Sequence, residues 1–472
     1  MPPNILWICT DQQRFNTISA LGNTQIRTPH IDQLAEQGVA FTQAYCQSPV
    51  CTPSRASFLT GRYPRTTRCR QNGQQIPADE RLLPRILADH GYRCGLSGKL
   101  HLASCANGRV EQRIDDGYEV FHWSHHPQPD WPENAYTQWL AKQGVTWEEL
   151  YQGPQQGHVK EGIPTKYHQT TWCAEMAIEF MRKQQTSAQP WLFSVNMFAP
   201  HHPFDPPAEY LARYRPEEMP LPKWRDGELD DKPRYQKLDH EWAHNQPGGM
   251  HVAEITPRES QQITAAYYAM IEHIDDQVGR MVDTLRETGQ LENTIVIFMS
   301  DHGEMLGDHG LYLKGPHFYD EAVHVPLVMS WPGHFLQSTH REAFVELTDL
   351  APTLLDCCEL EIEPQIQGRS FRSLLCDAAA PDEFRPDVYC EYTNSWTHHR
   401  SYGSMLRTAT HKLVVYHGTD DGELYDLVND PDEFANLWND SSHQMTKLNL
   451  MKRLFDRSMF TLDPLPTRLG PF

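Results

Sequence analysis

Four short apolar runs, each followed at once by polar residues, constrain the fold of this chain more than any other feature of its sequence. The runs are Asn4 to Thr10, Tyr92 to Ser97, Trp191 to Phe198 and Ile295 to Ser300. Runs of this length, rich in β-branched and aromatic residues, are typical of strands buried on both faces of a sheet. We therefore expect a sheet covered by helices on both sides.

Helical spacing between these runs supports that arrangement. From Glu259 to Glu287, apolar residues recur at the interval of an α-helix, and the pattern stops before Gly289. A shorter helix is expected over Ile31 to Gln37, after the start signal Thr28-Pro29. Alternating strands and helices predict a large mixed, mostly parallel sheet between helices. In such sheets, ligands bind beyond the carboxyl ends of the strands.

The last part of the chain, residues 381–472, is predicted to form a smaller α+β domain after an α/β domain at residues 1–380. A final helix is expected near Ser442 to Phe460, followed by an extended tail with three prolines, Thr461 to Phe472. The strands of its small antiparallel sheet are predicted at Ser404 to Thr410, Lys412 to His417 and Glu423 to Leu427.

Two segments, residues 103–167 and 203–257, carry no clear periodicity. Both are rich in Pro, Trp, His and charge. Long irregular segments of a compact enzyme are often lids or substrate walls. Surface insertions without function are an equally good interpretation.

Composition and charge narrow the function classes. The formal net charge of −21 argues against nucleic-acid binding, which needs a basic surface. No run of about 18 apolar residues is present, so we expect no membrane span. Met1-Pro-Pro leads directly into an apolar run without a basic region or cleavage site, and we expect a cytoplasmic location. The 11 cysteines lack CxxC spacing and fit free thiols in a reducing compartment.

The sharpest local motif is the stretch CTPSRASFLTG, which begins at Cys51. Thr52 is placed to cap a helix that has Pro53 in its first turn and Gly61 beyond its end. Cys51 would then lie at a helix N-terminus beside Arg55. Unpaired N–H groups and a guanidinium favour anions and lower the pKa of a thiol. A small buried cysteine without function is the alternative.

This stretch resembles the maturation signal of type I sulfatases, Cys-x-Pro-Ser-Arg followed by Leu-Thr-Gly. The resemblance runs from Asn4 to about Pro332 and resumes in Glu423-Leu-Tyr-Asp-Leu. It implies the α/β sandwich of the alkaline phosphatase superfamily with a smaller C-terminal domain. It also implies that a separate formylglycine-generating enzyme oxidises Cys51 to formylglycine. A hydroxyl of the hydrated aldehyde would then attack sulfur.

Two acidic pairs follow predicted strands, Asp11-Gln12 and Asp301-His302. A lone Asp after a strand is usually a cap or turn residue, but two of them beside a nucleophile loop suit a hard divalent cation. The resemblance implies that these four residues and Cys51 hold the metal, with Asp301 as a possible base. Gln12 replaces the commoner second Asp of the family. Ca²⁺ is expected, and Mg²⁺ or Mn²⁺ stay open.

The family resemblance assigns further roles by position. In Gly98-Lys99-Leu100-His101, Lys99 would contact the sulfate, and His101 would bind the formylglycine and help to expel sulfate from it. His201 is the candidate acid for the leaving oxygen, with its neighbour His202 the weaker choice. Lys314 would bind the sulfate and the leaving oxygen, and Arg55 would share in neutralising the charge. Taken singly, each of these residues is more often a solvated surface group.

Aromatic rings beside cations suit a sulfated saccharide, so a carbohydrate sulfate is favoured over a simple aryl sulfate. Buried packing explains the tryptophans equally well. The residues that could form a substrate wall are His122, Trp123, His125, His126 and Trp131, and in the C-terminal part Trp396, His398, His399 and Arg400.

Two alternatives stay open. Phosphonate monoesterases and phosphodiesterases of the same superfamily share the nucleophile, an Asp-Gln pair and an Asp-His pair. Gln12 and His302 therefore lean towards them, whereas Gly-Lys-Leu-His leans towards sulfatases. A non-catalytic protein that binds sulfated glycans would be marked by the loss of a site residue, and no expected position is missing. Association into a homo-oligomer through the tail is also left open.

Overall fold

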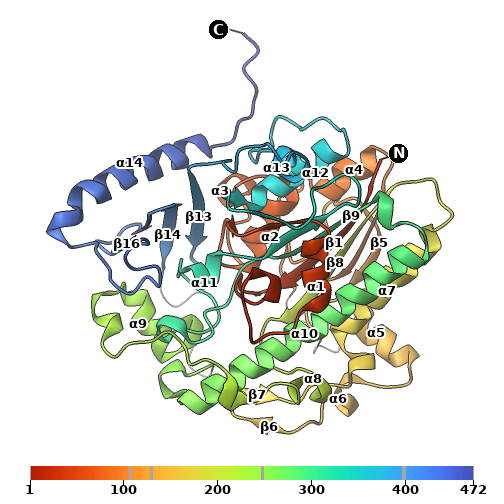
Figure 1. Cartoon of the computed structure of the whole chain (residues 1–472), viewed down its shortest axis with the longest axis horizontal. Helices are drawn as coiled ribbons and strands as arrows, with labels where there is room; N and C mark the ends of the chain where they lie inside the picture. The colour runs from red at the N-terminus through yellow and green to blue at the C-terminus, as the bar shows by residue number, and fades with distance from the viewer. Residues whose placement is uncertain (1, 106–108, 128–130, 246–248, 396–399, 471–472) are drawn as a thin grey trace.

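The computed structural model describes residues 2–105, 109–127, 131–245, 249–395 and 400–470 (Figure 1). An eight-stranded sheet runs through the molecule in the order β11-β2-β10-β9-β1-β8-β4-β5. Strands β9, β1, β8, β4 and β5 are parallel, and β10 pairs antiparallel with β9. The strands are β1 (Asn4–Asp11), β2 (Val39–Phe41), β4 (Arg93–Gly98), β5 (Tyr118–Trp123), β8 (Trp191–Pro200), β9 (Thr294–Ser300), β10 (Leu327–Ser330) and β11 (Thr339–Arg341).

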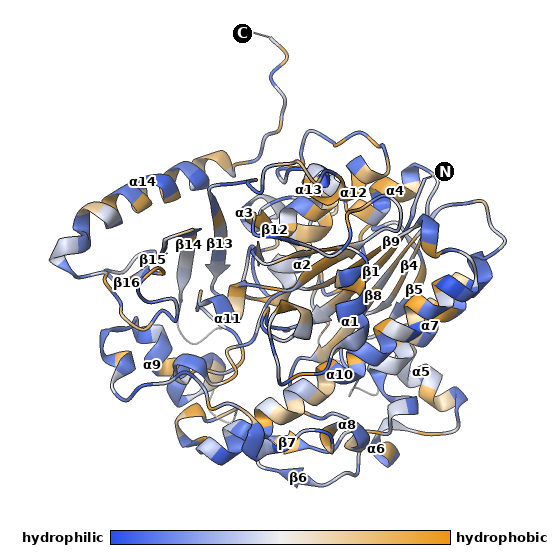
Figure 2. Cartoon of the chain, in the orientation of Figure 1, coloured by the Kyte–Doolittle hydropathy of each residue, from blue (hydrophilic) through white to orange (hydrophobic). Residues whose placement is uncertain are grey.

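Each face of this sheet is covered by helices and has its own hydrophobic core. In β1, Ile5 and Trp7 point to one core and Leu6 and Ile8 to the other, as the two-residue period of a strand requires. Figure 2 shows these central strands as a hydrophobic layer. One core contains residues of α2 (Cys51–Thr60), α4 (Leu83–Asp89), α12 (Leu350–Cys357) and α13 (Arg372–Cys376), and the other those of α1 (Pro29–Glu36), α5 (Ala135–Lys142), α7 (Gln169–Gln184) and α10 (Pro257–Glu287).

The long helix α10 matches the prediction from periodicity closely. It begins two residues before the predicted start because Thr256 forms a capping box with Glu259, and Pro257 occupies the first turn. It ends before Gly289, which has a φ of 71°. Tyr267, in its middle, donates a hydrogen bond of 2.5 Å to the backbone oxygen of Gln12. The helix therefore supports the loop that follows β1.

A four-stranded antiparallel sheet forms the C-terminal part, in the order β13-β14-β15-β16. The sequence predicted three of these strands and missed β13 (Asp387–Thr393). Charged residues in β13 hid the pattern: Asp387 pairs with Arg453, and Glu391 pairs with Arg65. The predicted fold class is confirmed, whereas the domain boundary stays a prediction. The other elements are β14 (Tyr402–Thr408), β15 (His411–Tyr416), β16 (Gly422–Asp426) and α14 (Gln444–Phe460).

Residues 103–167 contribute the edge strand β5 and helix α5, which the sequence did not predict, and the other described parts of both segments form short elements beside the large sheet. Both wrap around its lower part in Figure 1. Their elements include α6 (Trp147–Leu150), β6 (Gln155–Gln156), β7 (Val159–Lys160), α8 (Ala208–Leu211) and α9 (Arg234–Glu241). Elsewhere lie β3 (Ala44–Tyr45), α3 (Pro64–Thr67), α11 (Asp320–Val323) and β12 (Val345–Glu346).

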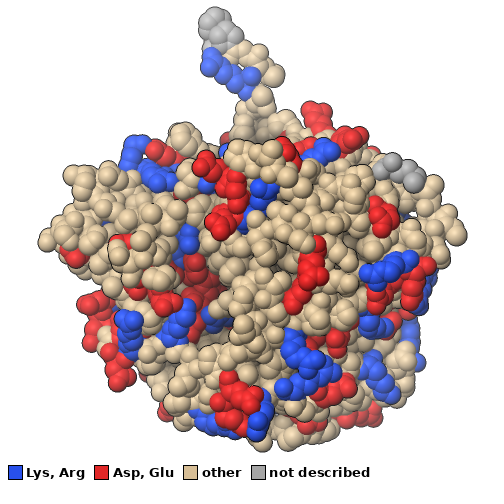
Figure 3. Space-filling view, in the orientation of Figure 1, with Lys and Arg blue, Asp and Glu red and all other residues tan. Residues whose placement is uncertain are grey.

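The distribution of charged side chains on the surface agrees with the acidic net charge of the sequence, which argues against nucleic-acid binding. Figure 3 shows acidic and basic side chains interspersed over the face in view, without a continuous basic patch. Among the described residues, no helix has the length and apolar character needed to cross a bilayer.

Candidate active site

The strand order brings four predicted site residues to one edge. Strands β9, β1, β8 and β4 are neighbours and run parallel, so their carboxyl ends lie side by side. Asp11 is the last residue of β1, while Asp301, Lys99 and His201 directly follow β9, β4 and β8. Asp11, Asp301 and Lys99 are buried, and His201 is half-buried.

Cys51 is the first residue of helix α2, which points its N-terminus at this edge. All ten residues of the helix are buried. The prediction that Thr52 caps the helix is wrong: Val50 takes the N-cap position without a side-chain bond, and Thr52 already belongs to the helix. Gly61 ends the helix with a φ of 68°, as predicted. Ser54 fixes the helix to the sheet by donating a 2.5 Å hydrogen bond to the Asp301 carbonyl.

Four side chains at this edge could hold a metal ion. The ligand atoms of Asp11, Cys51, Asp301 and His302 all lie within 4.8 Å of one another. The Sγ atom of Cys51 is 3.7 Å from Oδ1 of Asp11 and 3.1 Å from Nε2 of His302. Two buried carboxylates are the donors that a hard divalent cation prefers. The residues therefore fit the metal that was predicted.

The ring of His302 is turned the right way for a ligand. Its Nδ1 atom lies 2.9 Å from the Gly303 carbonyl, which can only accept a hydrogen bond. When the ring is neutral, as a metal ligand must be, its Nε2 lone pair therefore faces Cys51 and the carboxylates. Burial opposes protonation, but the charges of Asp301 and Cys51 raise the pKa of His302 to about 9. The group of anions thus attracts positive charge.

Lysine and arginine side chains hold the remaining carboxylate oxygens. Oδ2 of Asp11 lies 2.5 Å from Nζ of Lys99 and 3.3 Å from a guanidinium nitrogen of Arg55. Arg55 also donates a 2.8 Å hydrogen bond to Oδ2 of Asp301. Burial alone would raise the pKa of Asp11, yet Lys99, Arg55 and Lys314 hold that pKa well below its usual range. Asp11 is therefore a carboxylate at neutral pH.

The thiol of Cys51 responds to the same charges. Burial and Asp11 raise its pKa, whereas Lys314, Lys99 and His302 lower it, and the pKa is lowered overall. The predicted effect of the setting on the thiol is therefore present. It comes from the side chains of Lys314, Lys99 and His302.

Gln12 connects the metal group to the second lysine. It has a φ of 68°, and its backbone N–H donates to Oδ1 of Asp301 at 3.1 Å. Its side-chain oxygen accepts a 2.5 Å hydrogen bond from Nζ of Lys314, and its side-chain nitrogen donates to Glu304. The predicted ligand Gln12 thus lies beside the four-residue group and orients Lys314.

The Gly-Lys-Leu-His loop leaves β4 in a tight turn. Gly98 has a φ of 96°, and a Cβ atom there would lie 1.9 Å from the Asn196 carbonyl. The same carbonyl accepts the Lys99 N–H at 3.0 Å, and the Asn196 side chain donates to the Lys99 carbonyl at 2.9 Å. His101 also has a positive φ, 61°, which is uncommon for a histidine. The loop thereby reverses direction at the edge of the site.

An arc of aromatic and imidazole rings runs from this loop to the end of β8. It borders the cations of the site, since Nζ of Lys99 lies 5.4 Å from the centre of the Phe198 ring. The centroid distances along the arc are 4.4 Å for His101–His125, 5.1 Å for His125–His126, 5.6 Å for His126–Trp131, 5.9 Å for His126–Phe198, 4.6 Å for Phe198–His201 and 4.2 Å for His201–His202.

The histidines of the arc are neutral at pH 7. Burial, reinforced by Lys99, lowers the pKa of His126 to about 4. Burial and Lys314 lower the pKa of His202 to about 3 and hold that of His201 well below its usual range. Nδ1 of His201 lies 2.6 Å from the His202 carbonyl, so Nδ1 carries the hydrogen and Nε2 keeps its lone pair. Neutral His201 therefore accepts at Nε2.

Some residues of the predicted substrate wall lie elsewhere. His122 has Glu179, Lys183 and Lys142 as its nearest charges, so it faces the helices beside β5. Trp123 is buried, and its ring packs at 5.8 Å against Trp131. Arg400 is exposed. Trp396, His398 and His399 lie outside the described residues.

Several residues that contact the site escaped sequence analysis. Glu304 follows the Asp301-His302 pair by two positions, which was an available signal. Glu111, Asn196 and His244 carried no such signal, because they lie in irregular segments or inside a strand. His244 belongs here because Lys314 and His202 lower its pKa, in addition to burial.

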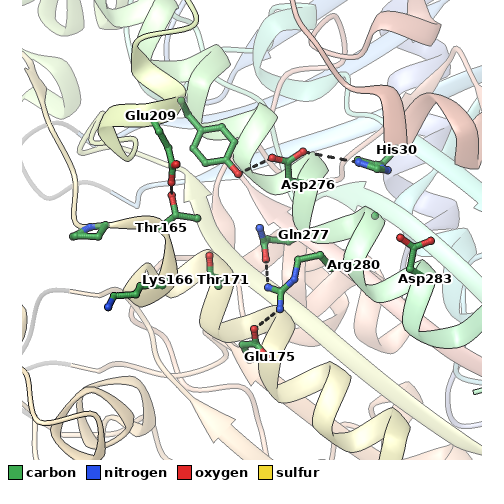
Figure 4. A pocket seen from close by; sticks show the side chains of 13 residues that line it. His30, Thr165, Lys166, Thr171, Glu175, Glu209, Asp276, Gln277, Arg280 and Asp283 are labelled. Carbon is green, nitrogen blue, oxygen red and sulfur yellow. Dashed lines mark hydrogen bonds and ion pairs between the residues drawn. The ribbon is translucent and has the colours of Figure 1, made fainter. Parts of the chain in front are cut away.

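A cavity of about 780 Å³ lies apart from this site, between α7, α8 and α10 (Figure 4). Asp276 accepts a 2.6 Å hydrogen bond from Tyr210 and lies 3.9 Å from His30. The neighbouring Asp275 accepts the backbone N–H groups of His30 and Ile31. Asp275 therefore caps α1, and none of the residues that line the cavity belongs to the edge described above.

Comparison with known proteins agrees with this geometry. The sulfatase family matches residues 3–360, and the C-terminal domain of N-sulphoglucosamine sulphohydrolase matches residues 307–459. An arylsulfatase of Clostridium perfringens is 29% identical over 477 residues, which cover 94% of this chain and 92% of the relative. An N-acetylglucosamine-6-O-sulfatase of Bacteroides thetaiotaomicron is 25% identical over 511 residues, covering 96% and 85%.

A solved structure gives the same picture of the fold. The phosphonate monoester hydrolase of Agrobacterium radiobacter superposes with a TM-score of 0.86 at 26% identity, covering 99% of this chain and 98% of the other. The family match spans most of the chain, and Cys51, the other residues that could hold a metal and the cations Arg55, Lys99 and Lys314 meet at one edge of the sheet. The chain therefore belongs to the sulfatase family of the alkaline phosphatase superfamily, and it is a sulfuric ester hydrolase.

Proposed function

We propose that this enzyme removes sulfate from O-sulfated carbohydrates, with formylglycine derived from Cys51 as its nucleophile. The arc of neutral rings between His101 and His202 carries the carbohydrate proposal. Aromatic faces stack on sugar rings, and neutral imidazoles exchange hydrogen bonds with hydroxyl groups. Buried Nδ1 of His202 and Nε2 of His125 have no hydrogen-bond partner within the described chain and are suited to that role.

The nucleophile and the metal would act together at the edge of the sheet. Hydrated formylglycine supplies the hydroxyl for attack on sulfur, and the divalent cation, most simply Ca²⁺, supplies positive charge at the sulfate oxygens. Asp11, Asp301, His302 and residue 51 would hold the cation, with Gln12 as the adjacent amide. Asp301 is also placed to accept a proton.

The cations of the chain are placed to stabilise the charge of the transferring group. Arg55 and Lys99 contact Asp11, and Lys314 contacts Gln12, from three separate parts of the chain. Preorganised positive groups of this kind provide the largest contribution to many such reactions. Neutral His201 keeps a lone pair at Nε2, so Lys314 is the better donor to the departing alcohol oxygen. His101 would take up the proton when sulfate leaves.

A mass spectrum of the tryptic peptide Thr28 to Arg55 tests the nucleophile. The protein is co-expressed with a formylglycine-generating enzyme, and Cys51→Ala is the matched control. An aldehyde or its hydrate at position 51 is expected. Release of sulfate from a panel of sulfated sugars then tests the substrate class. An unmodified thiol in the presence of the maturation enzyme would contradict the proposal.

Phosphonate monoester hydrolysis is the second candidate. The Asp11-Gln12 and Asp301-His302 pairs and the likeness to the Agrobacterium radiobacter enzyme favour it. Measurements of kcat/KM on an aryl sulfate and on a phenylphosphonate ester that release the same phenol separate the two candidates. A higher value for the sulfate is expected. A preference for the phosphonate would make sulfate hydrolysis the side activity.

A further inference from the structure

A buried carboxylate behind the Gly-Lys-Leu-His loop has no counter-ion. Glu111 is 2% exposed, and no ion pair joins it to a cation in the part of the chain that the structure describes. Its oxygens accept hydrogen bonds from three consecutive backbone N–H groups, those of His101 at 2.8 Å, Leu102 at 2.9 Å and Ala103 at 3.3 Å. The indole N–H of Trp123 is a fourth donor at 3.0 Å.

Such a carboxylate is costly unless its hydrogen bonds are complete. Burial raises the pKa of Glu111, and the N–H donors of His101 and Trp123 oppose that rise. A neutral or apolar residue would pack at this position without that cost, so packing alone does not account for a glutamate. The four N–H donors identify what the carboxylate does: it gathers the backbone of residues 101–103 around one charged group.

The first residue that Glu111 holds is the one with strained backbone. His101 has a φ of 61°, a conformation that is unfavourable for a residue other than glycine and persists only where contacts fix it. The Glu111 oxygen on the His101 N–H is the contact that fixes it. The imidazole ring of His101 packs edge to face against that of His125, with 4.4 Å between the ring centroids, at the start of the arc.

Glu111 also reaches the arc through a second route. Trp123, its fourth donor, packs at 5.8 Å and 15° against Trp131, and Trp131 contacts His126 at 5.6 Å. The Glu111 carboxylate therefore accepts hydrogen bonds both from the loop that carries Lys99 and His101 and from Trp123, which packs against Trp131 of the arc. Lys99 itself is held separately, by Asn196 and Asp11.

We propose that Glu111 is a positioning residue for the reaction: its carboxylate holds the His101 backbone so that the imidazole meets the group at position 51. This inference rests on the proposed role of His101. It predicts that Glu111 acts through His101, without touching the substrate.

A double-mutant cycle tests that relationship. Glu111→Gln keeps the shape and one acceptor oxygen, and we expect kcat to fall about 10- to 100-fold with KM changed less than about threefold. Glu111→Ala should lose more than Glu111→Gln. In a His101→Ala background, Glu111→Gln should reduce kcat further by less than about twofold.

The control variant is Glu119→Gln, which makes the same change at an exposed carboxylate whose partner is Arg93. It should retain kcat within about threefold. If Glu111→Gln lowers kcat by the same factor with and without His101, the positioning role is wrong. If His101→Ala itself turns over normally, the proposed role of His101 fails, and this inference fails with it.

Amide hydrogen exchange gives a readout that does not depend on turnover. In Glu111→Gln, the N–H groups of residues 101–103 should exchange at least about tenfold faster, while those of β1 keep their rates. The unmodified Cys51 protein is sufficient for this experiment. Unchanged exchange at residues 101–103 would show that the carboxylate does not hold the loop and would overturn the proposal.

Discussion

Nζ of Lys99 lies 2.5 Å from Oδ2 of Asp11, although their strands β4 and β1 are separated by β8. The lysine therefore spans the end of β8 to reach the carboxylate. Its charge holds one oxygen of Asp11 and leaves Oδ1 directed at Cys51, 3.7 Å away. This division of the two oxygens lets a single aspartate contact both the candidate metal-binding group and the cations Lys99 and Arg55.

Removing the cation at position 99 should slow the reaction on every substrate. Lys99→Ala is expected to reduce kcat/KM at least about 100-fold, roughly 2.7 kcal/mol, because the charge on the transferring group loses a partner in a buried site. The control Lys183→Ala removes an exposed lysine and should leave the rate unchanged. Near-normal turnover of Lys99→Ala would exclude this lysine from the reaction.

Lys314 should show its role through the leaving group. Lys314→Ala is expected to slow a sugar sulfate at least about 100-fold, and to slow 4-nitrophenyl sulfate by a smaller factor, because a phenolate leaves without a proton. His201→Ala should show no such dependence on the leaving group. Steady-state rates on the two substrates check this. Equal losses for Lys314→Ala on both would assign it to sulfate binding alone.

The metal should bind at the Asp11 and Asp301 group. Chelation by EDTA is expected to lower the rate at least about 100-fold, and Ca²⁺ should restore the rate. Ca²⁺ should also raise the Tm of the chelated protein, because a ligand that binds only the folded state stabilises it.

Asp301→Asn should abolish the rise in Tm, whereas Asp276→Asn, in the cavity of Figure 4, should keep it. Parallel titrations with Mg²⁺ and Mn²⁺ would establish the preferred ion. A Tm that responds to Ca²⁺ in Asp301→Asn as in the parent protein would place the metal elsewhere.

Acid should destabilise the fold through buried histidines such as His168. Burial lowers its pKa to about 4, and its Nδ1 accepts the Thr170 N–H at 3.1 Å as the cap of α7. In the unfolded chain this histidine becomes protonated as the pH falls through about 6.5, whereas in the folded chain it becomes protonated only near pH 4. The free energy of unfolding should therefore fall by up to roughly 3 kcal/mol between those pH values from this residue alone.

Asn at this position keeps a cap acceptor and does not titrate, so His168→Asn should flatten that dependence. Urea unfolding at several pH values measures the effect. His340→Asn, at an exposed position, is the control and should leave the slope unchanged. A parent-like slope in His168→Asn would assign the acid sensitivity to other groups.

The C-terminal sheet should depend on one buried cation. Lys412 is fully buried, and its Nζ lies 2.7 Å from both Asp320 and Glu433. Lys412→Met removes the nearest cation of both carboxylates, although Arg407 still lies 3.6 Å from Asp320, and should lower the free energy of unfolding by about 3–5 kcal/mol. Lys237→Met, at an exposed position, should change it by less than about 1 kcal/mol. A small loss in both variants would contradict this.

The fold was predictable because its core obeys simple periods. The runs of β1, β8 and β9 are apolar on both faces, and α10 repeats with the period of a helix over its whole length. Strand β13 escaped because its charged residues are neutralised by partners elsewhere in the chain. A single sequence read locally does not contain that pairing.

The site residues were likewise predictable where they belong to a regular pattern and were missed where they do not. Asp11, Lys99, His201 and Asp301 were found because each lies at the carboxyl end of a recognisable apolar run. The N-cap of α2 was assigned wrongly because Thr52 has a capping side chain but lies two positions after Val50, the residue at the N-cap. Glu111, His125, His126 and Trp131 lie in a segment without a period, and only the tertiary fold shows what their side chains contact.

The complete burial of α2 has a consequence for the order of events in the cell. Every residue from Cys51 to Thr60 is inside the folded protein, and Pro53, Arg55 and Gly61 are covered by the sheet and its neighbouring helices. A modifying enzyme that reads this stretch in extended form has access to it only before the chain closes over it. We therefore expect oxidation at Cys51 to compete kinetically with folding. Conditions that slow folding should raise the fraction of chains that mature.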